Sequence, residues 1–168
     1  MLPREYRCTS VTETKSFAAD LANSLPTGIV IALIGDLGSG KTTFAQGFAK
    51  GLGISEHVGS PTFKLVSEYD GQKGKLIHVD AYRLEGIDDF LNIGGEDILT
   101  TPRAIILIEW GDKLESILPP DAIRISFKRV LNVENERLIS IKELKASKFW
   151  RLKQLLKFVE YRILKMIM

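Results

Sequence analysis

The chain has 168 residues, of which 45% are hydrophobic and 26% charged, with a formal net charge of +2; this composition fits one globular domain and excludes a disordered or fibrous protein. Its single cysteine, Cys8, excludes an internal disulfide and has no Cys or His near it in sequence that would suggest a metal site. No apolar run reaches the length needed to cross a bilayer and the first residues lack a signal-peptide core, so we expect a cytoplasmic protein with no transmembrane segment.

The first predicted elements are a helix and a buried strand. Ser10 and Glu13 have the spacing of a capping box, and apolar residues follow at helical intervals as far as Pro26. Residues 28–34 form a continuous apolar, β-branched run, which is typical of a strand buried on both faces of a parallel sheet. A glycine-rich loop separates this strand from a second predicted helix over residues 43–53.

The middle of the chain predicts a hairpin, a broken helix and another buried strand. Residues 64–69 and 76–80 flank the turn sequence Asp-Gly-Gln-Lys-Gly, which is a hairpin signal. Residues 88–99 have a helical pattern interrupted by two glycines, and residues 104–108 form a second β-branched run that ends at Glu109.

The last part of the predicted domain contains a short helix and two half-exposed strands. The helix covers residues 113–118 and is stopped by two prolines, whereas residues 123–127 and 137–141 alternate with a period of two. We therefore predict one α/β domain over residues 1–144, with a mixed, mainly parallel sheet that is covered by helices on both faces.

Residues 145–168 are predicted to form a C-terminal extension, a basic amphipathic helix. Between residues 142 and 168 there are eight Lys or Arg and two Glu, while apolar residues recur at intervals of three or four. The apolar stripe can pack on the domain or on a partner. The cations can face an acidic partner, an anionic membrane surface, or simply water.

The strongest motif lies between the first buried strand and the helix that follows it. Residues 35–42 read Gly-Asp-Leu-Gly-Ser-Gly-Lys-Thr and match the phosphate-loop pattern G-x-x-x-x-G-K-[ST] in its proper context. Its glycines let successive N–H groups turn toward phosphates at the positive end of a helix. Lys41 is then expected to reach the β- and γ-phosphates of ATP, and the Thr42 hydroxyl to bind Mg²⁺. A purely structural glycine turn is the alternative.

Two carboxylates end predicted strands and could complete a Mg²⁺ site. Mg²⁺ held by a hydroxyl and phosphate oxygens needs nearby carboxylates to bind it or to orient its waters. Glu109 has the position of a Walker B carboxylate, although aspartate is usual there and glutamate is one methylene longer. Asp80 could hold a metal-bound water or position the attacking water. For each of them, an ordinary carboxylate at a strand end is the alternative.

Four more residues near these motifs have two interpretations each. Thr62, in the sequence Ser-Pro-Thr-Phe, could sense the γ-phosphate, or belong to an ordinary Ser-Pro turn. Arg83 could serve as an internal arginine finger or lie on the surface. For His78 we predict a hydrogen-bonded structural histidine rather than a catalytic one, and for Trp110 a packing role rather than nucleotide stacking.

Four motifs taken together resemble the bacterial TsaE family. They comprise residues 35–43, 60–63, 78–83 and 108–110, and their order and spacing make the likeness, which covers about residues 10–141, more specific than the phosphate loop alone. The resemblance implies a P-loop NTPase-like fold and an ATPase that supports N6-threonylcarbamoyladenosine synthesis at position 37 of tRNA. It also implies partners of the TsaB and TsaD type, whose complex turns over through ATP hydrolysis by this protein.

The resemblance also implies the roles of single residues. Thr42 and Glu109 would bind Mg²⁺, and Asp80, with Lys41 and Glu109, would be needed for hydrolysis. The nucleotide would be held by Gly35, Gly38, Ser39, Gly40, Lys41, Thr42, Thr43 and Thr62. Adenine contacts would fall near Val11 and Asn132, positions that no motif fixes. The basic extension is not part of the resemblance; tRNA phosphates would attract its cations.

Other nucleotide-binding classes fit less well. A small-molecule kinase also combines a phosphate loop with a chain of this size, but no compact arginine-rich lid is evident between residues 109 and 129. A GTPase would need an Asn-Lys-x-Asp motif, which the sequence lacks. A nucleotide-dependent switch with negligible hydrolysis stays open as an alternative.

Overall fold

The structure is a computed structural model that describes residues 4–142 of the chain. In chain order its elements are β1 (Arg4–Cys8), α1 (Val11–Ser24), β2 (Ile29–Ile34), α2 (Lys41–Gly51), β3 (Val66–Gly71), β4 (Gly74–Asp80), α3 (Ile87–Asn92), α4 (Gly95–Thr100), β5 (Ile105–Glu109), the 3-10 helix η1 (Gly111–Ile117), β6 (Ile123–Arg129) and β7 (Arg137–Lys142). The predicted basic helix over residues 145–168, and with it the division of the chain near residue 144, lies outside the described residues.

The seven strands within residues 4–142 form one twisted sheet in the order β1-β7-β6-β2-β5-β4-β3. The four central strands are parallel, because β2 pairs in parallel with β5 and β6, and β5 pairs in parallel with β4. The flanking strands β3, β7 and β1 are antiparallel to their neighbours. The predicted mixed sheet with a parallel centre is therefore confirmed, as is the hairpin that β3 and β4 form.

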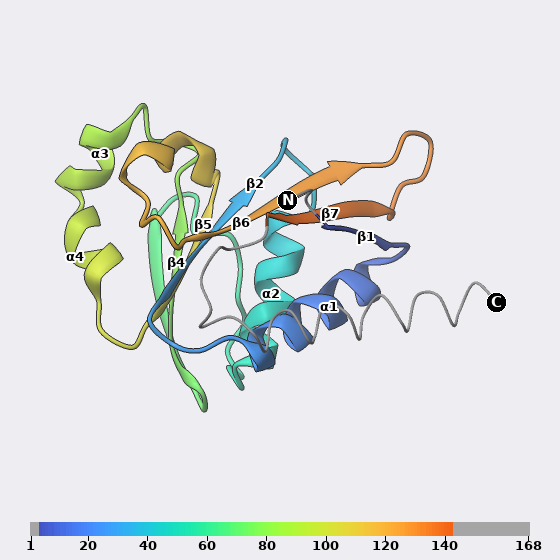
Figure 1. Ribbon diagram of the computed structural model, residues 1–168, viewed down its shortest axis with the longest axis horizontal. Helices are drawn as coiled ribbons and strands as arrows, with labels where there is room; N and C mark the ends of the chain where they lie inside the picture. Colours follow the sequence, from blue (N-terminus) through green and yellow to red (C-terminus); the bar gives the residue numbers. More distant parts are fainter. Residues whose placement is uncertain (1–3, 143–168) are drawn as a thin grey trace.

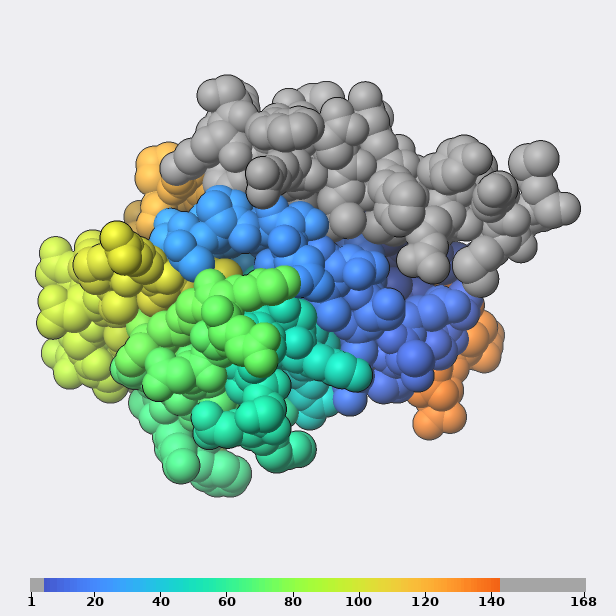
Figure 2. Space-filling view, turned by 90° about the horizontal axis from the view of Figure 1, so that it is seen from below, coloured from blue at the N-terminus to red at the C-terminus, as the bar shows by residue number. Residues whose placement is uncertain are grey.

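Two hydrophobic cores lie on opposite faces of the sheet. Alternate residues of β2 enter different cores: Ile31 and Leu33 pack with α1 and α2, whereas Val30 and Ala32 pack with residues of α3 and η1. Figure 1 shows α1 and α2 on one side of the sheet and α3, α4 and η1 on the other. In the view of Figure 2, the blue segment of α1 lies beside the teal segment that includes α2. Helices on both faces explain why β2 has no polar side.

The N-terminal strand β1 is an element that the sequence analysis did not predict. Tyr6 and Cys8 point into the core and Glu5 and Arg7 point outward, a period-two pattern over five residues that is too short to indicate a strand by itself. Pairing with β7 and an ion pair from Arg7 to Glu136 hold it in place. Burial raises the pKa of the Cys8 thiol to about 11, so it stays protonated at neutral pH.

Other predicted elements need small corrections. The helix predicted over residues 113–118 is a 3-10 helix that begins two residues earlier, at Gly111. The first strand of the hairpin begins at Val66 rather than residue 64, because Leu65 has a φ of 65° and cannot continue an extended strand. Ser10 does cap α1, since its Oγ accepts the Glu13 N–H at 3.1 Å. Within residues 4–142, no helix is long and apolar enough to cross a membrane.

Helices α1 and α2 touch through glycines, which leads to a first prediction. A Cβ added at Gly47 would lie 2.5 Å from the Cα of Lys15, and one at Gly51 would lie 2.5 Å from the carbonyl oxygen of Ala19. Alanine favours a helix over glycine by about 1 kcal/mol, but this gain is outweighed by a backbone overlap that cannot be relieved by rotating a side chain. We therefore expect Gly47→Ala to lower the free energy of unfolding by about 1–3 kcal/mol in a urea titration.

The matched control for this prediction is Gly59→Ala. Its added Cβ would have its nearest neighbour at 3.8 Å, an ordinary contact, so its stability should stay within about 0.5 kcal/mol of the unchanged chain. Equal stability of Gly47→Ala and Gly59→Ala would show that α1 and α2 are not packed this closely.

Candidate functional site

Three segments that carry the predicted site residues meet at one edge of the sheet. The loop of residues 35–40 joins β2 to α2, Asp80 ends β4, and Glu109 ends β5. Because β5 lies between β2 and β4 and all three are parallel, their carboxyl ends are adjacent; Glu109 is in register with Leu33 on one side and Asp80 on the other. Ligands of open α/β sheets bind at such an edge.

The loop before α2 leaves the first N–H groups of that helix available. Gly40 caps α2 with a φ of 104°, a conformation that favours glycine, and it offers no side chain as a cap. No acidic residue lies in the first turn of α2 either. Helix α1, in contrast, has the capping side chain of Ser10 and the acidic Glu13 at its start. Close packing sets the start of the loop, since a Cβ on Gly35 would lie 2.7 Å from the carbonyl oxygen of Phe127. The helix end is therefore suited to an anion.

Lys41 is folded back over this loop. Its ammonium donates to the carbonyl oxygens of Gly35 at 2.6 Å and Asp36 at 2.8 Å, and it lies 4.0 Å from the centre of the Trp110 ring. Burial lowers the pKa of Lys41, and the negative charges of Glu109 and other nearby acids oppose that shift only in part. A buried cation thus stands where the motif predicts contact with phosphates.

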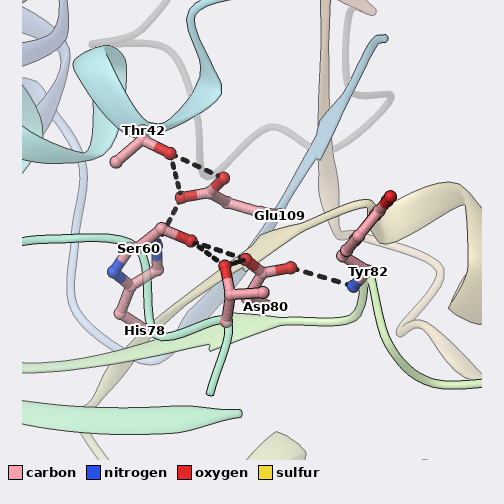
Figure 3. Close-up of polar contacts among 7 residues, drawn as sticks. Thr42, Ser60, His78, Asp80, Tyr82 and Glu109 are labelled. Atoms are coloured by element: carbon pink, nitrogen blue, oxygen red, sulfur yellow. Dashed lines mark hydrogen bonds and ion pairs between the residues drawn. The ribbon is translucent and has the colours of Figure 1, made fainter. Parts of the chain in front are cut away.

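A partly buried hydrogen-bond chain joins α2, β5 and β4. The Thr42 hydroxyl lies 3.0 Å from each carboxylate oxygen of Glu109, and Nε2 of His78 lies 2.9 Å from Glu109 Oε1. Glu109 is 3% exposed and His78 is fully buried. Figure 3 shows Thr42 and His78 on different sides of the Glu109 carboxylate. Thr42 and Glu109, the two predicted Mg²⁺ ligands, are thus in contact, and His78 is hydrogen-bonded as predicted.

Asp80 holds a second cluster beside the first. Its Oδ2 accepts from the hydroxyls of Ser60 at 2.6 Å and Thr62 at 2.7 Å, and its Oδ1 accepts from the backbone N–H of Tyr82 at 2.9 Å. Figure 3 shows this cluster next to Glu109. The turn that contains Thr62 is thereby tied to the end of β4. The role of Ser60 was missed by the sequence analysis, although its motif was noted, because a serine two residues from a threonine does not show what its hydroxyl contacts.

The aromatic and basic residues of the motifs lie around these clusters. The Trp110 ring packs on Tyr82, with 5.1 Å between centroids, and under the Lys41 ammonium, in keeping with a packing role. The Arg83 guanidinium lies 4.5 Å from the centroid of the Phe63 ring, which is 84% exposed. Arg83 is on the surface in this structure, and its alternative role as an arginine finger stays a prediction.

The two predicted adenine contacts are both exposed. Val11 begins α1 and is 45% exposed, and Asn132 occupies the exposed turn between β6 and β7 with a φ of 65°. Arg137, at the end of that turn, donates through Nη2 to the carbonyl oxygen of Gly38 at 3.2 Å. Arg137 had no sequence signal, because a lone arginine at a strand start fits any surface. The nucleotide roles of Val11 and Asn132 stay predictions.

The donor set of the site suits Mg²⁺ better than a metal held by protein alone. Among residues 4–142, no group of three or more His, Cys, Asp or Glu side chains could hold a metal ion. Thr42 and Glu109 offer one hydroxyl and one carboxylate, and Mg²⁺ commonly takes few protein ligands and completes its shell with phosphates and water. The residues present therefore fit Mg²⁺ that arrives with a nucleotide.

Comparisons with known proteins show which family the chain belongs to. Residues 8–139 match the family described as "Threonylcarbamoyl adenosine biosynthesis protein TsaE". The chain is 39% identical over 132 residues to the tRNA threonylcarbamoyladenosine biosynthesis protein TsaE of Bacillus subtilis, covering 79% of this chain and 82% of that protein. It is 38% identical over 124 residues to the protein of the same name from Treponema pallidum, covering 73% of this chain and 90% of the relative.

A solved structure extends the likeness to the fold. The crystal structure of Bacillus subtilis YdiB superposes with a TM-score of 0.73 at 31% identity, and the match covers 96% of this chain and 98% of the other. The family match spans most of the chain and includes the phosphate loop, Asp80 and Glu109. The chain belongs to the TsaE family.

Proposed function

We propose that this protein is a cytoplasmic P-loop ATPase that binds and hydrolyses Mg-ATP. Through hydrolysis it would support the N6-threonylcarbamoyladenosine modification of tRNA by promoting turnover of a TsaB–TsaD complex. The observation that carries the proposal is the contact of Thr42 with Glu109 beside the buried Lys41, at the open end of α2. Membership of the TsaE family, whose relatives are named for this modification, supports the tRNA pathway.

Each group at the site has a separate task in this proposal. The N–H groups of residues 38–43 and the Lys41 ammonium bind the phosphates, and Lys41 exchanges its two loop carbonyls for phosphate oxygens. Thr42 and Glu109 would hold Mg²⁺, which when bound neutralises charge on the phosphates. Asp80 orients the attacking water, and its contacts with Ser60 and Thr62 keep its carboxylate in place.

The Mg²⁺ site gives a second prediction. Thr42→Ala removes one ligand but none of the phosphate-binding N–H groups, so ATP affinity in EDTA should stay unchanged. The increase in ATP affinity caused by Mg²⁺ should be at least about tenfold smaller, since mutation of residues that only support metal ligands already lowers metal affinity by about tenfold or more. Calorimetric titration of ATP with and without Mg²⁺ measures both quantities. Thr100→Ala, an exposed change in α4, is the control. If Mg²⁺ increased the ATP affinity of Thr42→Ala as much as that of the control, Thr42 would not be a metal ligand.

The experiment that tests the proposed function measures phosphate release by the full chain, alone and with TsaB and TsaD. We expect slow release alone and faster release with the partners, together with modified tRNA only when all three proteins and ATP are present. A high rate of phosphate release that does not change when TsaB and TsaD are added would contradict the proposal and favour an independent enzyme such as a kinase. Nucleotide binding without any hydrolysis would favour a switch.

A further inference from the structure

His78 occupies a place in the site that the proposed chemistry does not use. It lies in β4 with no exposed surface, and its Nε2 lies 2.9 Å from Glu109 Oε1. Its other ring nitrogen, Nδ1, is buried and has no hydrogen-bond partner among the described residues. A buried polar ring that makes one hydrogen bond, and makes it to a predicted metal ligand, calls for a specific explanation.

The chemistry of the two groups fixes the direction of this bond. An ionised carboxylate can only accept, so the proton between the two atoms belongs to His78 Nε2 and is donated to Glu109. The Thr42 hydroxyl donates to the same carboxylate from α2. Glu109 therefore receives one donor from the helix that follows the phosphate loop and another from the neighbouring strand.

The strand register makes His78 a rigid support. His78 is in register with Leu107 on β5, two residues before Glu109, so both side chains project from the same face of adjacent parallel strands. Glutamate has one more rotatable bond than the aspartate usual at this position, and fixing that bond costs side-chain entropy each time the carboxylate binds a metal. A donor on a buried strand fixes the carboxylate already when the chain folds, so less side-chain entropy is lost when the metal binds.

We propose that His78 is a positioning residue for Glu109. It holds the carboxylate so that Glu109 and Thr42 present their oxygens together to Mg²⁺, and it does not itself touch the metal or the nucleotide. The inference rests on the proposed function, because it gives His78 a task only in a chain that binds Mg-ATP. It assigns to the histidine of β4 a role distinct from general packing of the core.

The test compares two substitutions that differ in their ability to donate. His78→Leu fills the site without a donor, and His78→Gln keeps an N–H close to the position of Nε2. ATP is titrated by calorimetry into each full chain, in EDTA and in Mg²⁺. We expect His78→Leu to bind ATP in EDTA with the affinity of the unchanged chain. The increase in its ATP affinity caused by Mg²⁺ should be about tenfold or more smaller than that of the unchanged chain. His78→Gln should retain most of that increase.

The chain supplies its own control, because its other histidine, His57, is exposed in the segment between α2 and β3. Mg²⁺ should increase the ATP affinity of His57→Gln as much as that of the unchanged chain. If His78→Leu folds and Mg²⁺ increases its ATP affinity as much as that of the unchanged chain, the positioning role is overturned while the proposed function stays intact. An unchanged chain that binds no ATP, or binds it without any effect of Mg²⁺, would overturn both.

A measurement on the unchanged sequence decides the matter if the His78 variants do not fold. In the full chain labelled with ¹⁵N-histidine, the His78 signal should show a slowly exchanging proton on Nε2, and its shift should change when Mg²⁺ is added with ATP. An Nε2 that carries no proton, or an Nε2 signal that does not respond to Mg-ATP, would contradict the proposal.

Discussion

Lys41→Ala is expected to lower the affinity for ATP by about 10- to 150-fold, the effect of losing charge-assisted hydrogen bonds worth about 1.5–3 kcal/mol. The ammonium is buried above the phosphate loop with the carbonyl oxygens of Gly35 and Asp36 as its partners. Bound phosphates offer it stronger, negatively charged acceptors. Calorimetric titration of ATP into both proteins measures the difference, and the loss should be present with and without Mg²⁺.

A control separates this effect from a general loss of positive charge. Lys50 is an exposed lysine in the last turn of the same helix, so Lys50→Ala removes the same charge from α2 without touching the loop. Lys50→Ala should bind ATP like the unchanged chain. Thermal unfolding of both variants shows whether Lys41→Ala is folded, since it leaves two loop carbonyls without their donor. Equal ATP affinity in folded Lys41→Ala and Lys50→Ala would refute the assignment of the phosphate site.

Asp80→Asn should reduce kcat for ATP hydrolysis by about 100-fold or more while leaving ATP affinity nearly unchanged, if Asp80 positions the attacking water. The substitution keeps the shape of the side chain but replaces an acceptor by an NH₂ donor. That donor would face the hydroxyls of Ser60 and Thr62, which now donate to Asp80 Oδ2. Phosphate release in the presence of TsaB and TsaD, together with ATP titration, gives the two quantities.

Two further variants interpret the Asp80 result. Asp70→Asn, at an exposed position of β3, should hydrolyse ATP like the unchanged chain. Ser60→Ala removes one of the three donors to Asp80 and leaves its charge, so its kcat should fall far less than that of Asp80→Asn. Hydrolysis by Asp80→Asn at the unchanged rate would leave Asp80 a structural role, which is to hold the turn of residues 60–62 to the end of β4.

Local patterns in the sequence were sufficient for most elements and for the phosphate loop. The buried strands β2 and β5 could be predicted because residues enclosed on both faces must be apolar, and the start of α1 because Ser10 caps it within four residues. The loop of residues 35–42 could be recognised because backbone binding of phosphates requires glycines and a lysine at fixed spacing. In each case the cause and its effect lie within a few residues of one another.

Contacts between distant segments decided the rest of the fold and of the site. β1 forms because it pairs with β7, whose residues lie about 130 positions further along the chain, and no pattern in five residues encodes that pairing. Similarly, the hydrogen bonds of His78 to Glu109 and of Arg137 to Gly38 join residues 31 and 99 positions apart. Such contacts depend on the order of strands in the sheet, which follows from the packing of the whole chain rather than from local periodicity.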